Sequence, residues 1–115
     1  MSLILCGKHI VFYGLIDSGN SLIDPLTRKS VIIISLKSLE KYLSKEDIDW
    51  LLQVRCRKIK CNTISESNVE IPVFDYKNLE LKFGDKNEKV HCVFGLVNQK
   101  FENGKYDCLL SRDFL

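Results

Sequence analysis

Turn-forming residues recur at short intervals along this chain, and they divide it into short segments rich in β-branched and aromatic residues. Segments of this kind, bounded by Gly, Asn, Asp and Ser, are typical of β-strands. Their regular spacing predicts a small, mostly β domain, built as a barrel or a sandwich. The predicted strands are residues 8–16, 31–34, 55–64, 69–74, 79–83, 89–97 and 106–110.

The stretch after the second predicted strand has helical periodicity instead. Apolar residues recur there three or four positions apart. Ser44 is a candidate N-cap, because it begins a sequence resembling a capping box that ends at Asp47. We therefore expect one helical insertion after the second strand region. Its apolar residues are Leu36, Leu39, Tyr42, Leu43, Ile48, Leu51 and Leu52.

Composition limits the class of protein. The 115 residues are 45% hydrophobic and carry a net charge of +2, which argues against disorder and predicts one domain over residues 1–115. The sequence has no run of about 20 apolar residues, which a membrane-spanning helix needs. No basic segment precedes an apolar one, as it would in a secretory signal. We therefore expect neither a membrane span nor a signal peptide in these residues.

The cysteine pattern favours free thiols over disulfides or a metal site. The number of cysteines is odd, and no two of them form a Cys-x-x-Cys pair. Reduced thiols in a cytosolic protein fit this pattern better than a secreted disulfide framework. A zinc site would need clustered Cys or His ligands, and the only histidines are His9 and His91. The cysteines are Cys6, Cys56, Cys61, Cys92 and Cys108.

A basic run at residues 55–60 has two interpretations. It could bind phosphate groups, as in a nucleic-acid-binding protein. It could equally be the solvated face of an edge strand, where charges discourage aggregation. The chain balances 17 basic against 15 acidic residues, and no aromatic residues are interleaved with the run to stack on bases. These features favour the edge strand and leave nucleic-acid binding as the weaker alternative.

An acid at the end of an apolar strand is the main chemical feature of the sequence. Residues 10–16 lead directly into Asp17-Ser18-Gly19-Asn20. A tight turn of this type can hold a carboxylate rigidly and surround it with backbone N–H groups. Gly19 lets the backbone approach closely, and the Ser18 hydroxyl can bond back into the turn. Taken alone, these four residues are more simply explained as an ordinary β-turn.

The end of the chain adds a second motif. The apolar pair Leu109-Leu110 is followed by the small residue Ser111, about 90 residues after the acid turn. This order resembles the retroviral-type aspartic proteases, in which an apolar pair followed by Gly packs beside the catalytic loop. The predicted hairpin at residues 55–74 lies where that family carries its flap. Ser111 stands in place of the family's Gly, and the hairpin tip lacks the glycines of retroviral flaps.

A closer resemblance covers residues 14–27. The acid turn is followed there by Leu22 and by Asp-Pro-Leu-Thr at residues 24–27. This sequence is similar to the acid loop of the sporulation sigma-E factor processing peptidases of spore-forming Firmicutes, and residues 106–110 also fit that family's C-terminal pattern. In that family a membrane-embedded N-terminal half precedes the peptidase half. The chain therefore resembles an excised peptidase domain.

The resemblance implies a fold and a site. The fold would be mostly β, a small closed barrel of the retroviral aspartic protease type with one helical insertion after the second strand region. Asp17 would be the catalytic residue. The tip of the substrate-binding flap would be Ser65, Glu66, Ser67 and Asn68, and the residues that support the catalytic loop would be Ser18, Gly19, Asn20, Leu109, Leu110 and Ser111.

The resemblance also implies an activity, that of an aspartic endopeptidase which removes the N-terminal pro-segment of a sporulation sigma-factor precursor. One Asp17 from each subunit of a symmetric homodimer would complete a pair of carboxylates that activates water. A signalling activator would act through the membrane half, at the cytoplasmic face of the membrane on the mother-cell side of the septum. No metal, organic cofactor or nucleic acid is implied. The alternative is a catalytically silent binding or dimerisation module with the same barrel.

Overall fold

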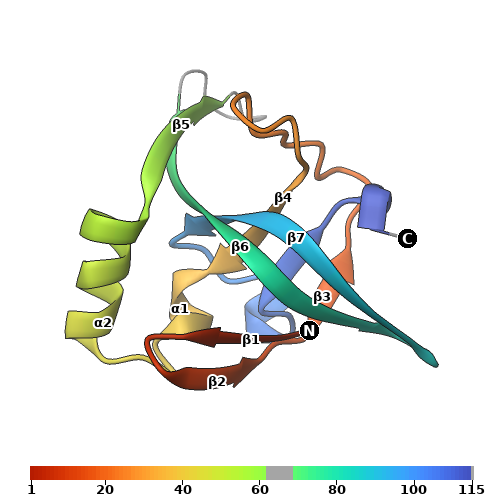
Figure 1. Ribbon diagram of the computed structural model, residues 1–115, viewed down its shortest axis with the longest axis horizontal. Helices are drawn as coiled ribbons and strands as arrows, with labels where there is room; N and C mark the ends of the chain where they lie inside the picture. Colours follow the sequence, from red (N-terminus) through yellow and green to blue (C-terminus); the bar gives the residue numbers. More distant parts are fainter. Residues whose placement is uncertain (62–68, 115) are drawn as a thin grey trace.

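The computed structural model describes residues 1–61 and 69–114, and this part of the chain is mostly β, as predicted (Figure 1). Its strands form one sheet in the order β2-β1-β6-β7-β4-β8-β3, with β5 pairing on β6 outside this path. The strands are β1 (Ser2–Leu5), β2 (Lys8–Val11), β3 (Gly14–Ile16), β4 (Val31–Ser35), β5 (Arg57–Cys61), β6 (Val69–Phe83), β7 (Lys86–Val97) and β8 (Cys108–Leu110).

The sheet curls into a half-barrel. Its two edge strands, β2 and β3, are consecutive in the chain and are separated only by Phe12 and Tyr13. The long β6–β7 ribbon crosses the molecule in Figure 1, and β6 carries a bulge between Tyr76 and Leu79 that increases its bend. Within the described residues no backbone ladder joins β2 to β3, so strand pairing leaves the barrel open.

The expected helical insertion follows β4. It consists of α1 (Leu36–Leu39), α2 (Lys45–Trp50) and a π-helical turn, η1 (Leu51–Arg55). The Ser44 hydroxyl accepts a hydrogen bond from the Asp47 backbone N–H at 3.1 Å, which confirms Ser44 as the N-cap of α2. No helix in the described part of the chain is long and apolar enough to cross a membrane.

Several strand predictions need correction, and the predicted strands 55–64 and 106–110 begin two residues later than expected, at Arg57 and Cys108. The predicted strand 8–16 breaks at Phe12 and Tyr13 into β2 and β3, and the predicted strands 69–74 and 79–83 are one strand, β6. The strand β1 was not predicted at all. It pairs with β2 through a two-residue turn at Cys6 and Gly7, whose φ angles of 50° and 73° match the left-handed backbone of tight hairpins.

Two apolar clusters hold the fold together. The main core lies inside the curved sheet and includes Phe74 and Phe94, whose ring centres are 5.4 Å apart. A smaller cluster is built from side chains of β4, β5, β6 and β7, and Leu22, from the loop after β3, packs against it. This second cluster connects the loop, the hairpin and the sheet. Its buried members are Val31, Ile59, Ile71, Val73 and Val93.

Candidate active site

Asp17 lies where β3 passes the end of β8. β8 runs parallel to β3 and antiparallel to β4, so it lies between the two strands that residues 17–30 connect. We refer to residues 17–30 as the acid loop. The Asp17 backbone N–H donates to the Leu110 carbonyl at 2.8 Å, so the loop begins directly beside the Leu109–Leu110 pair. A Cβ on Gly14 would lie 2.4 Å from Leu110 Cδ1 and 3.0 Å from Cys108 Sγ, so glycine lets β3 pack on β8 without displacing these two side chains.

The turn after β3 orients the Asp17 carboxylate. The Gly19 N–H donates to Asp17 Oδ1 at 2.9 Å, and the Asn20 N–H donates to the Asp17 carbonyl at 3.0 Å. Asp17 is half-buried, whereas Ser18 and Gly19 are exposed. The side chain that closes the turn is therefore Asp17 itself, not Ser18 as expected from the sequence. One oxygen of a solvent-accessible carboxylate is held in a fixed direction.

Asn20 anchors the acid loop to the sheet. Its side chain is buried, and Nδ2 donates to the carbonyls of Val31 at 3.2 Å and Leu109 at 3.3 Å. Its Oδ1 accepts from the Leu22 N–H at 3.4 Å. One amide thus connects the loop to both β4 and β8. Ser111 is also buried, and its hydroxyl accepts from the Asp113 N–H at 3.2 Å, at the start of the terminal turn η3 (Arg112–Phe114).

The two strands of the predicted hairpin are present and paired. β5 pairs with β6 from Arg57 opposite Val73 to Cys61 opposite Val69. The predicted flap residues Ser65, Glu66, Ser67 and Asn68 lie outside the described residues.

A buried carboxylate in the acid loop forms an ion pair with β5 that was not predicted from the sequence. Asp24 is fully buried, and Arg57 binds both of its carboxylate oxygens, at 2.9 Å from Nη1 and 2.6 Å from Nη2. The Thr27 hydroxyl donates to Asp24 Oδ2 at 2.6 Å, and the N–H groups of Leu26 and Thr27 complete the turn. The Arg57 guanidinium holds the pKa of Asp24 well below its usual range, despite the opposing effect of burial.

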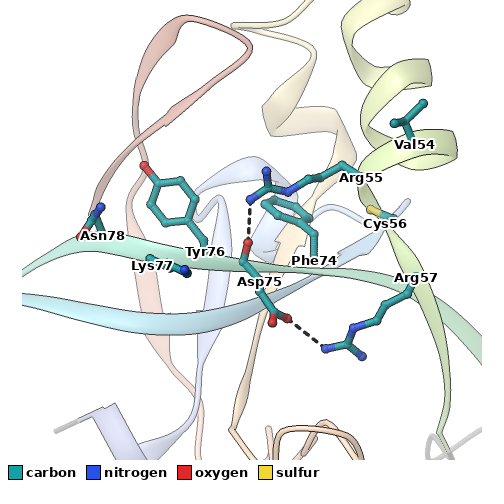
Figure 2. A pocket seen from close by; sticks show the side chains of 9 residues that line it. All are labelled: Val54, Arg55, Cys56, Arg57, Phe74, Asp75, Tyr76, Lys77 and Asn78. Carbon is teal, nitrogen blue, oxygen red and sulfur yellow. Dashed lines mark hydrogen bonds and ion pairs between the residues drawn. The ribbon is translucent and has the colours of Figure 1, made fainter.

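The basic run is therefore not simply a solvated face. Besides the Arg57 ion pair, Arg55 donates to the Asp75 carbonyl at 2.8 Å and lies 5.8 Å from the Phe74 ring centre (Figure 2). Arg57 Nη2 also contacts Asp75 Oδ1 at 3.0 Å. These residues line a cavity of about 720 Å³ at the base of the hairpin, and no acid-loop residue lines it. One feature of the sequence points to the ion pair: the Asp-Pro-Leu-Thr turn, whose carboxylate needs hydrogen-bond donors.

Four cysteines are free thiols, as expected: Cys6, Cys56, Cys92 and Cys108. Burial raises the pKa of Cys56 to about 11 and the pKa values of Cys92 and Cys108 to about 12, so these three thiols stay protonated at neutral pH. Among the residues that the structure describes, no three His, Cys, Asp or Glu side chains cluster closely enough to hold a metal ion.

The comparison with protein families matches residues 1–114 to the Peptidase U4 family, described as sporulation factor SpoIIGA. The chain belongs to this family. The sporulation sigma-E factor-processing peptidase of Priestia megaterium is 30% identical over 83 residues, which cover 59% of this chain but only 27% of that relative. The family predicted from residues 14–27 is thus confirmed. The search of solved structures found no match for this SpoIIGA-family chain.

Proposed function

We propose that this chain is the peptidase domain of an aspartic endopeptidase, in which Asp17 is the catalytic residue. The observation that carries the proposal is the Asp17 turn: Oδ1 is held by the Gly19 N–H, and the loop is anchored over β8 by Asn20. Membership of a peptidase family adds independent support. A carboxylate that is oriented yet solvent-accessible suits a group that must take a proton from water.

The proposed reaction needs a second carboxylate close to Asp17. Two carboxylates about 3 Å apart cannot both ionise, so the pair shares one proton. The ionised member takes a proton from water as the water attacks the scissile carbonyl carbon, and the protonated member polarises the carbonyl oxygen. The proton from water then belongs to the pair, and a proton is returned to the leaving amine.

A second copy of the chain would supply that carboxylate. The sequence contains one Asp-Ser-Gly, and the two buried aspartates have other partners. Asp24 binds Arg57, and Asp107 accepts from the Ser38 hydroxyl at 2.7 Å and the Tyr13 N–H at 2.9 Å. A two-fold axis through the site would bring Asp17 of both subunits together. We propose that two half-barrels of this kind form a retroviral-protease-like dimer.

The proposed substrate is a sigma-factor precursor that loses its N-terminal pro-segment. The name of the Priestia megaterium relative supports this choice. An extended peptide between two subunits would pair with exposed strand edges, which give main-chain bonds and side-chain pockets. We propose that the full-length protein works at the cytoplasmic face of the membrane on the mother-cell side of the septum, under a signalling activator that acts through its membrane half.

A statine-type transition-state analogue tests the aspartic mechanism. We expect it to block precursor cleavage in membranes from cells that co-express the full-length protein, its activator and the precursor. Its hydroxyl mimics the attacking water and binds only where two carboxylates share a proton, so such analogues bind at least about 100-fold more tightly than substrate. The matched deoxy analogue should not inhibit. Cleavage unaffected by either compound would reject the aspartic class and favour the silent-module alternative.

If the active species is a dimer, its specific activity depends on protein concentration. We expect specific activity to fall on dilution below the dimer dissociation constant, because the monomer holds half of the site. Two copies joined in one polypeptide should keep their activity over the same dilution series. An active species at the mass of the monomer would contradict the dimer proposal.

A further inference from the structure

The acid loop has a second anchor at its far end. Residues on either side of Asp24 form a small hairpin: the Val31 N–H donates to the Leu22 carbonyl at 2.9 Å, Ile23 bridges Ser30, and the Asp24 N–H donates to the Lys29 carbonyl at 2.9 Å. Asp24 is therefore fixed relative to the rest of the loop. Whatever holds its carboxylate also fixes the position of the acid loop.

Arg57 is the group that holds Asp24. It is the first residue of β5, and its guanidinium binds both oxygens of Asp24 and one oxygen of Asp75, on β6. A bidentate Arg–carboxylate pair fixes direction as well as distance. Asp24 is 0% exposed, so its attraction to Arg57 is only weakly screened by water. Leu22 packs on the apolar cluster to which Ile59 of β5 belongs, so the loop and β5 share this cluster.

We propose that Arg57 and Asp24 are positioning residues for Asp17. Their ion pair docks the acid loop on the β5–β6 hairpin and so sets where the Asp17 carboxylate stands relative to the hairpin strands that would hold substrate. The loop is then fixed at two points, by Asn20 on β8 and by Asp24 on β5. This inference rests on the proposed function of Asp17.

Two matched arginine variants of the full-length protein test it. Arg57→Gln removes the bidentate contact, whereas Arg55→Gln makes the same change of charge at a guanidinium whose partners among the described residues are the Asp75 carbonyl and the Phe74 ring. We expect Arg57→Gln to lower kcat for precursor cleavage by about 10- to 100-fold, with a smaller change in KM, because a misplacement of about 1 Å can cost 100-fold. Arg55→Gln should stay within about twofold of the unchanged protein.

Further variants separate positioning from folding. Arg57→Lys keeps the positive charge but loses the pair of guanidinium nitrogens that binds both oxygens of Asp24. Its kcat should therefore lie between those of Arg57→Gln and the unchanged protein. Asp24→Asn combined with Arg57→Gln should lose no more kcat than the worse single variant, since both remove one interaction. Measurements are made at a temperature where circular dichroism shows each variant folded, and if Arg57→Gln does not fold, Arg57→Lys and Asp24→Asn provide the comparison.

The outcomes distinguish failure of the positioning role of Arg57 from failure of the proposed function of Asp17. Equal kcat in the folded Arg57→Gln and Arg55→Gln variants would overturn the inference. Asp17→Asn is measured in parallel. If it still cleaves, the proposed function fails and the positioning role fails with it. If Asp17→Asn is inactive while folded Arg57→Gln is fully active, only the positioning role fails.

Discussion

Replacing Asp17 by asparagine in the full-length protein is expected to abolish cleavage of a co-expressed sigma-factor precursor. An amide cannot take a proton from water or share one with a second carboxylate, and loss of general base catalysis lowers rates by about 10²- to 10⁴-fold. The fold should survive, because the asparagine oxygen can still accept the hydrogen bond that Gly19 donates to Asp17 Oδ1. Loss of activity would then report chemistry rather than unfolding.

The matched control for this variant is Asp85→Asn. Asp85 is exposed in the turn between β6 and β7, so the substitution makes the same change of charge far along the chain from the acid loop. Full cleavage by Asp85→Asn and none by Asp17→Asn would establish Asp17 as catalytic. Undiminished cleavage by Asp17→Asn would end the aspartic-peptidase proposal. Cleavage by the full-length protein but not by the 115-residue chain would mean that assembly of the site depends on the rest of the protein.

The acid turn could be predicted because its signals are local. An apolar strand that ends in Asp17-Ser18-Gly19-Asn20 specifies both the strand and the turn from a few adjacent residues, and the N-cap at Ser44 is specified in the same way. The roles within the turn were less predictable. Asp17 accepts the Gly19 N–H, and the buried partners of Asn20 come from strands far along the chain. Turn propensity alone contains no information about those partners.

Long-range features could not be predicted from the sequence. Asp24 and Arg57 are 33 residues apart, and the pattern around Arg57 gives a basic strand without showing that one of its cations pairs with a buried carboxylate. β6 continues past Tyr76 through a bulge. The polar residues around this bulge made the sequence look like two separate strands. Strand pairing depends on tertiary packing, so local sequence patterns also could not predict that β2 and β3 would be the two unjoined edges of the described sheet.

Arg57→Met is expected to lower the free energy of unfolding of the 115-residue chain by about 3 kcal/mol at pH 7, at the lower end of the range for breaking a buried ion pair. The low end applies because the Arg57 side chain is 31% exposed while Asp24 is 0% exposed. The variant leaves the Asp24 carboxylate buried, and its remaining donors in the described part of the chain are the Thr27 hydroxyl and two turn N–H groups. Arg55→Met is the matched control and should cost clearly less.

The dependence on pH distinguishes a charge effect from lost packing. In the unchanged chain the pKa of Asp24 is lowered by Arg57, so its stabilisation is complete above the ordinary aspartate pKa of about 3.9 and is lost as pH falls through the folded value. Without Arg57, burial favours the protonated acid, and the cost of the substitution should shrink as Asp24 takes up a proton. Urea unfolding at pH 7, 5 and 3.5 should therefore show the difference between Arg57→Met and the unchanged chain narrowing toward acid. A difference that stays constant with pH would assign the loss to packing of the arginine stem and remove the electrostatic basis for docking the acid loop on β5.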